Sequence, residues 1–128
     1  MHDELKRALD AHREWKDKLM SAIAAGVTDL EPRDICRDDR CEVGEWIHKK
    51  AGWTYRASRH FSQVKEKHAT FHREAGKVVA LIKAGKLVEA QREIESGGYS
   101  WATHDLTGQL SQWLRELLAE PKRRMHHP

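Results

Sequence analysis

The sequence predicts an all-α protein, an antiparallel four-helix bundle with a short extra helix between helices 1 and 3. Apolar residues recur every three or four positions through most of the 128-residue chain, which is the period of a helix surface that faces a core. No segment alternates in the way that a strand does, and no internal repeat is present. The 39% hydrophobic and 34% charged residues also fit helices with large solvated faces.

The first half of the chain contains one long and one short predicted helix. Helix 1 runs from about residue 3 to 25, and Gly26 stands where a left-handed C-terminal cap belongs. Residues 27–33 form a connection in which Pro32 acts as a helix breaker. A short helix then covers about residues 38–50, includes Cys41 in its interior, and ends at Gly52.

The second half is predicted to form three further helical segments. The longest begins at residue 55 or 58 and runs to residue 84, with Gly85 as its cap. Another begins near residue 86 and is interrupted or kinked at Ser96-Gly97-Gly98. The last covers about residues 100–119 and ends before Pro121. We expect a single domain over residues 1–128, with residues 120–128 as a tail.

Charge and hydropathy exclude several classes of function. The net charge is +3, and the two signs are mixed along the chain, which indicates solubility and no nucleic-acid partner. No apolar run approaches the ~20 residues of a membrane span, and the N-terminus does not have the pattern of a signal peptide. Two cysteines do not make a disulfide scaffold, so we expect a cytoplasmic protein.

A pair of histidines marks the centre of the longest predicted helix. His68 and His72 are four residues apart, so they share one helix face, and they lie within an apolar stripe. Both side chains should therefore point toward other helices, where each ring nitrogen needs a partner. The pair alone fits a metal site and a pair of hydrogen-bonded core histidines equally well.

Two upstream residues complete a possible ligand set. His12 lies on the apolar face of helix 1, although a lone histidine there is more often a core residue than a ligand. Cys41 lies on the short helix. Three imidazoles and one thiolate suit tetrahedral Zn²⁺, with distances of about 2.0–2.1 Å to nitrogen and 2.3 Å to sulfur. Four protein ligands leave no open position, which argues against a hydrolytic zinc enzyme.

These residues and their neighbours resemble the chemoreceptor zinc-binding (CZB) domain family over about residues 5–118. The resemblance is carried by three motifs: His12-x-x-Trp15, Cys41-x-Val43-Gly44-x-Trp46 and His68-x-x-x-His72. It implies a zinc site made of three histidines and one cysteine in a four-helix bundle, often in a homodimer. It also implies a regulatory role in bacteria, attached to chemoreceptors or diguanylate cyclases. In some members the zinc-bound cysteine senses oxidants such as hypochlorous acid.

The sequence contains no transmembrane, coiled-coil signalling or cyclase segment, so we expect a stand-alone member of that family. Such a member would signal in trans to the machinery of chemotaxis or cyclic-di-GMP. Two alternatives stay open, a zinc buffer and a purely structural metal-bound bundle. A metalloenzyme is less favoured because it needs an open coordination position and a general base.

Several residues near the candidate ligands in the sequence have the chemistry for supporting roles. Trp15 and Trp46 would exclude water and orient the imidazoles, although plain core packing is an equally good description. Gly44 indicates either a close helix contact beside the thiol or a weak helix. Cys36 could be a spare ligand or a redox partner that traps oxidised Cys41 as a disulfide, but a simple role at the core edge is favoured.

We expect the other histidines and several glutamates to lie outside the ligand set. Three histidines fall off the apolar faces and should be solvated: His48, His60 and His104. Four glutamates could each orient a ligand imidazole, and the sequence does not choose among them: Glu14, Glu42, Glu45 and Glu66. A di-iron site is disfavoured because the apolar stripes carry no inward carboxylates.

Overall fold

A computed structural model describes residues 2–37, 41–51, 54–55 and 57–119, and their regular structure is entirely helical. The predicted tail at 120–128, and the predicted helix ends at Gly52 and Pro121, lie outside these residues. The elements in chain order are α1 (His2–Ala25), α2 (Pro32–Ile35), α3 (Glu42–Trp46), the π-helix η1 (Ile47–Ala51), α5 (Arg59–Lys83), α6 (Leu87–Ser96) and α7 (Gly98–Ala119).

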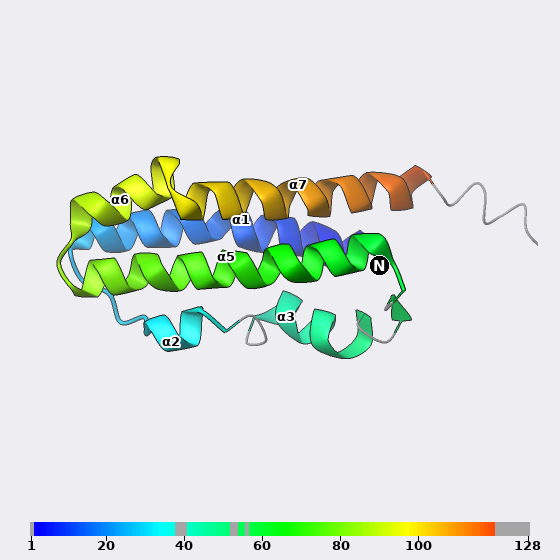
Figure 1. Cartoon of the computed structure of the whole chain (residues 1–128), viewed down its shortest axis with the longest axis horizontal. Helices are drawn as coiled ribbons and strands as arrows, with labels where there is room; N and C mark the ends of the chain where they lie inside the picture. Colours follow the sequence, from blue (N-terminus) through cyan, green and yellow to red (C-terminus); the bar gives the residue numbers. More distant parts are fainter. Residues whose placement is uncertain (1, 38–40, 52–53, 56, 120–128) are drawn as a thin grey trace, which may run out of the picture.

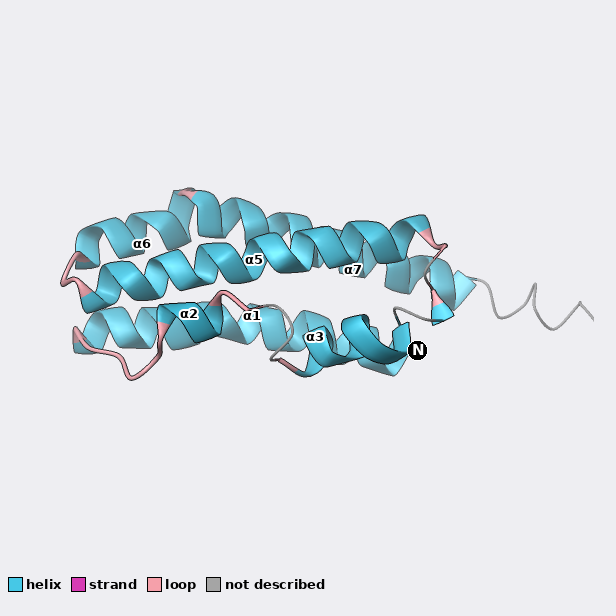
Figure 2. Cartoon of the chain, turned by 60° about the horizontal axis from the view of Figure 1, so that its bottom comes forward, coloured by secondary structure: helices cyan, strands magenta, loops and turns pink. Residues whose placement is uncertain are grey.

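The long helices α1, α5 and α7 run side by side along the long axis of the molecule (Figure 1). The short elements α2 and α3 lie along one side of this group, where α2 packs on α5 and α3 packs on α1 (Figure 2). The colours of Figure 1 show that α1 and α5 run in one direction and that α6 and α7 both run in the other. Consequently α6 is not a separate antiparallel helix, because it continues into α7 across a break at Gly97.

Local sequence signals set most of the helix ends. Gly26 and Gly85 have positive φ angles of 75° and 76°, and each donates its backbone N–H to a carbonyl in the last turn of the preceding helix. Ser58 caps α5, because its hydroxyl accepts a hydrogen bond from the backbone N–H of Phe61 at 3.3 Å. The predicted caps at Gly26 and Gly85 are therefore confirmed.

Two local predictions in the segment between α1 and α5 are wrong. Pro32 does not break a helix but begins one, since proline at the first helical position loses no intrahelical hydrogen bond. Cys41 is not inside the short helix but is the N-cap of α3, where its sulfur accepts the backbone N–H of Gly44 at 3.2 Å. The expected helix continues after α3 as the π-helix η1. Residues 38–40 lie outside the described part of the chain.

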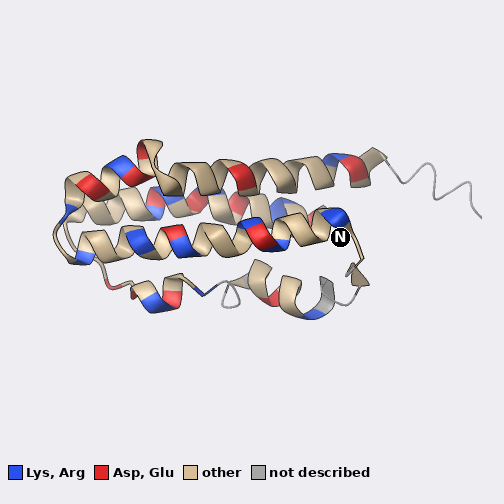
Figure 3. Ribbon diagram, in the orientation of Figure 1, with Lys and Arg blue, Asp and Glu red and all other residues tan. Residues whose placement is uncertain are grey.

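The core is formed by the inward faces of α1, α5 and α7. Ala90 and Ile94 of α6, Val43 of α3 and Ile47 of η1 complete it. Residues of both charge signs are interspersed along the helices (Figure 3). No helix in the described ranges is long and apolar enough to cross a membrane.

A candidate metal centre

Four side chains that are distant in the sequence converge on one point inside the bundle. His12 comes from the middle of α1, His68 and His72 come from successive turns of α5, and Cys41 precedes α3. The three histidines are at most 2% exposed, whereas Cys41 is partly exposed. One candidate ligand atom from each residue lies within 4.8 Å of all the others, so the group could hold a metal ion.

The distances within the group have the size that a tetrahedral ion requires. The Nε2 atoms of His68 and His72 are 3.2 Å apart, and Cys41 Sγ lies 3.3 Å and 3.5 Å from them. Zinc–ligand bonds of normal length would place two nitrogens about 3.3 Å apart and a nitrogen and a sulfur about 3.5 Å apart. The distances among the candidate ligand atoms of His68, His72 and Cys41 therefore match those between ligands of a tetrahedral zinc ion.

Backbone carbonyls fix the orientation of two of the imidazoles. Nδ1 of His12 lies 2.8 Å from the carbonyl oxygen of Ala8, and Nδ1 of His72 lies 2.9 Å from that of Ile35. A carbonyl can only accept, so both Nδ1 atoms carry the proton and both Nε2 atoms present a lone pair. This is the usual arrangement around a metal-bound histidine.

The glutamates that could have oriented the imidazoles do not take part in these hydrogen bonds. Glu14, Glu45 and Glu66 are exposed, while the side chain of Glu42 lies outside the described part of the chain. Sequence reasoning missed the carbonyl of Ile35, because a backbone group has no residue signature.

Two buried nitrogens of the group lack a hydrogen bond. Nε2 of His12 and Nδ1 of His68 are inaccessible and have no hydrogen-bond partner among the residues that the structure describes. A buried polar atom without a partner costs about 1–3 kcal/mol. Since Nδ1 of His12 is held by Ala8, Nε2 is the nitrogen that a metal ion would satisfy. The donor set present in the fold therefore fits zinc.

Burial also keeps the histidines in the protonation state that metal binding needs. Desolvation lowers the pKa of His12 to about 4, although its hydrogen bond to Ala8 opposes the shift. Desolvation, with repulsion from His12 and His72, lowers the pKa of His68 to about 2. Both imidazoles are accordingly neutral at pH 7, and neutral imidazole is the form that coordinates metal.

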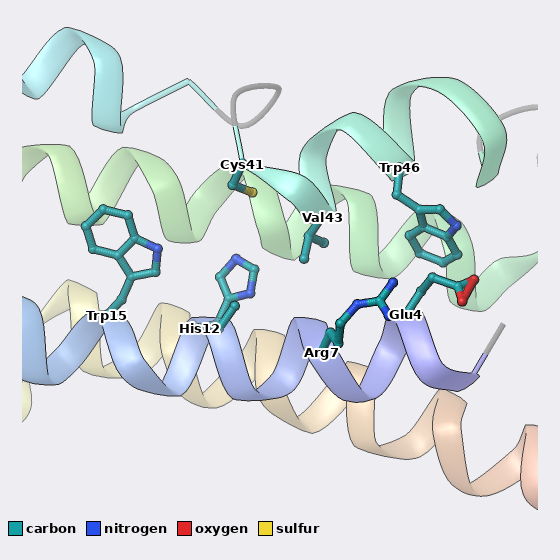
Figure 4. A pocket seen from close by; sticks show the side chains of 8 residues that line it. Glu4, Arg7, His12, Trp15, Cys41, Val43 and Trp46 are labelled. Carbon is teal, nitrogen blue, oxygen red and sulfur yellow. The ribbon is translucent and has the colours of Figure 1, made fainter.

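Cys41 is held by its position at the beginning of α3. Its sulfur accepts a hydrogen bond from the buried backbone N–H of Gly44. Figure 4 shows His12 pointing from α1 toward Cys41, with Trp15 on one side and Val43 on the other. A cavity of about 60 Å³ adjoins both residues and lies between α1 and α3, where Arg7 and Trp46 also line it.

The two tryptophans have different surroundings. Trp15 is half-buried and lines two hollows that adjoin Cys41, one between α1 and α3 and the other beside α2. Trp46 lines the first hollow and packs against an aromatic group at the far end of α3, formed with Tyr55 and Trp113. Trp15 thus covers the candidate site, and Trp46 anchors the helix that follows Cys41.

Cys36 is not part of the four-residue group. It is exposed at the end of α2, and its thiol donates to the carbonyl of Arg33 at 3.3 Å. His48 and His104 are exposed, as expected. The expectation for His60 is wrong, because it is half-buried, stacks on Trp113 and forms an ion pair with Glu116 when protonated.

Comparison with models of known protein families matches residues 12–79 to the chemoreceptor zinc-binding domain, CZB. The matched span is more than half of the chain and contains all four residues of the group. The chain belongs to this family. Searches of curated proteins and of solved structures give no match. The resemblance to the CZB family that the three motifs indicated is confirmed. The described part of this CZB domain is all-helical.

Proposed function

We propose that this CZB domain binds one zinc ion through His12, Cys41, His68 and His72. The spacing of three ligand atoms at tetrahedral edge lengths carries this proposal. The unpartnered Nε2 of His12 and the neutral state of the His12 and His68 imidazoles support it. Zinc, when bound, would keep the Cys41 thiol deprotonated at neutral pH. Trp15, Gly44 and Trp46 would shield and position these ligands.

Metal content is the direct test of the ligand set. The purified protein should carry about one zinc per chain, and His72→Ala should lower zinc affinity strongly because it removes a ligand. His104→Ala is the matched control, since His104 is exposed and outside the group. Elemental analysis after gel filtration measures the stoichiometry. Full zinc content in His72→Ala, or loss of zinc in His104→Ala, would contradict the assignment.

We further propose a regulatory role in which Cys41 is the reactive residue. Cys41 is the only partly exposed member of the group, and two hollows adjoin it. Its thiolate would attack the chlorine of hypochlorous acid, which would give a sulfenyl chloride and release hydroxide. Water would then hydrolyse the sulfenyl chloride to a sulfenic acid and chloride. Over the two steps sulfur loses two electrons and chlorine gains two. The product is a poorer ligand and a poorer cap for α3. Cys36 would be the thiol that condenses with this sulfenic acid to form a disulfide and water.

The change would then be read by a partner. We propose that α3 and η1 move when Cys41 is released, because α3 is only five residues long. The expected partners are a second copy of the chain in a homodimer and a chemoreceptor or a diguanylate cyclase in trans, in the bacterial cytoplasm. Nucleic acid is not proposed as a partner, since positively and negatively charged residues are mixed along the described helices (Figure 3).

We also propose that residues 1–128 form one domain, in which α2, α3 and η1 together complete a four-helix bundle with α1, α5 and the joined α6 and α7. A zinc buffer and a structural metal site remain the alternative functions. Catalysis is disfavoured because four protein ligands would leave no open coordination position. Zinc-dependent change in shape without unfolding distinguishes a sensor from a structural site, which should unfold when metal is removed.

A further inference from the structure

The one-turn helix α2 lies unusually close to α5 at a glycine. A Cβ atom added to Gly76 would lie 3.0 Å from Cβ of Cys36 and 3.1 Å from the carbonyl oxygen of Pro32. Real Cβ atoms rarely approach other atoms so closely, and the second of these is a backbone atom that cannot rotate away. A side chain at position 76 would therefore require the backbone of α2 to shift away from α5 by a few tenths of an ångström.

The same short helix makes a polar contact one turn earlier on α5. The carbonyl oxygen of Ile35, the last residue of α2, lies 2.9 Å from Nδ1 of His72. Gly76 follows His72 by four residues, so the two positions share one face of α5. The close approach at Gly76 and the hydrogen bond at His72 thus join the same pair of elements.

We propose that Gly76 is a positioning residue for the metal site, because it brings the carbonyl of Ile35 within hydrogen-bond distance of His72. That hydrogen bond holds the proton on Nδ1 and turns the lone pair of Nε2 toward Cys41 and His68. This inference rests on the proposed zinc function. Removing a group that hydrogen-bonds to a metal-bound histidine typically lowers metal affinity by about 10–100-fold.

Gly76→Ala tests this role, with Gly108→Ala as a matched control. Both glycines lie inside long helices, but a Cβ at Gly108 meets nothing within 4 Å. Alanine favours the helix at both positions, so a general gain in helix stability is common to the two variants. Competition with a chelating indicator should show about 10-fold weaker zinc binding for Gly76→Ala and unchanged binding for Gly108→Ala.

A nuclear magnetic resonance measurement separates positioning from simple packing. In the zinc-loaded wild-type protein with ¹⁵N-labelled histidine, His72 should show a slowly exchanging Nδ1–H. That proton should exchange faster in Gly76→Ala and remain protected in Gly108→Ala. The double variant Gly76→Ala/Cys36→Gly lacks the contact at 3.0 Å, because glycine has no Cβ. Gly76→Ala should therefore lower zinc affinity less in the Cys36→Gly background than in the wild-type background.

The outcomes that overturn the proposal are distinct from a failure of zinc binding itself. Equal zinc affinity in Gly76→Ala and Gly108→Ala would overturn it, as would weaker binding with an unchanged Nδ1–H signal of His72. A wild-type protein with His72 protonated on Nε2 would overturn it even if Gly76→Ala does not fold. Absence of zinc binding in the wild-type protein would instead refute the proposed function, and this inference with it.

Discussion

Acidification should destabilise the metal-free protein, because two buried histidines must remain neutral in the fold. The pKa of His12 is lowered to about 4 and that of His68 to about 2, whereas an unfolded histidine has a pKa of about 6.5. Between these values the unfolded chain binds more protons than the folded chain. The free energy of unfolding therefore falls as the pH falls below about 6.5, and each group stops contributing once the pH passes below its folded pKa.

The expected loss follows from the linkage between proton binding and folding. Between pH 7 and pH 5, each of the two histidines should lower the free energy of unfolding by about 1.9 kcal/mol, so about 4 kcal/mol together. That sum is a large part of the ~5–15 kcal/mol that stabilises a typical domain. A bound zinc ion competes with protons for the same nitrogens, so the loaded protein should also release metal over this range.

Urea unfolding of the chelator-treated protein at pH 7, 6 and 5, followed by circular dichroism, measures this loss. His68→Leu removes one titrating group from the core and should reduce the loss by about 1.9 kcal/mol, whatever its effect at pH 7. His104→Ala should retain the full loss, because His104 is exposed. A change below about 1 kcal/mol in the wild-type protein between pH 7 and pH 5 would refute the explanation.

Two further predictions concern oxidation and assembly. One equivalent of hypochlorous acid should modify Cys41 before the methionines and release zinc, because a metal-bound thiolate remains nucleophilic, and mass spectrometry of the digested protein identifies the site. If the methionines were modified while Cys41 stayed intact and zinc stayed bound, the oxidant-sensing role would be refuted and the structural metal site would be favoured. Sedimentation should show a homodimer at micromolar concentration, as the family resemblance implies, and a monomer at every concentration tested would exclude a constitutive dimer.

The parts of the fold that could be predicted from the sequence depend on local patterns. The four-residue spacing of His68 and His72, within an apolar stripe, is sufficient to place both side chains inside the bundle. Gly26 and Gly85 likewise mark helix ends because few other residues tolerate positive φ angles. The position of Cys41 beside the histidines could be predicted only from resemblance to a family, since no local pattern brings Cys41 to both α1 and α5.

The parts that could not be predicted depend on contacts between distant segments. His60 is half-buried where it stacks on Trp113 and pairs with Glu116, and both of these residues come from α7. The orientation of His72 comes from a backbone carbonyl, and any residue type could supply one at position 35. Gly76 offered one signal, since a glycine inside a long helix on the same face as a candidate ligand indicates a close approach of another backbone.

The site combines two kinds of support, and this difference has a kinetic consequence. The three histidines stand on helices of 24 and 25 residues, whereas Cys41 precedes a helix of five. Opening of α3 alone would therefore uncover one ligand while the other three keep their places, and such local opening needs much less free energy than global unfolding. Zinc held by the three histidines alone should leave faster than zinc held by all four ligands, so metal exchange should not require global unfolding of the chain.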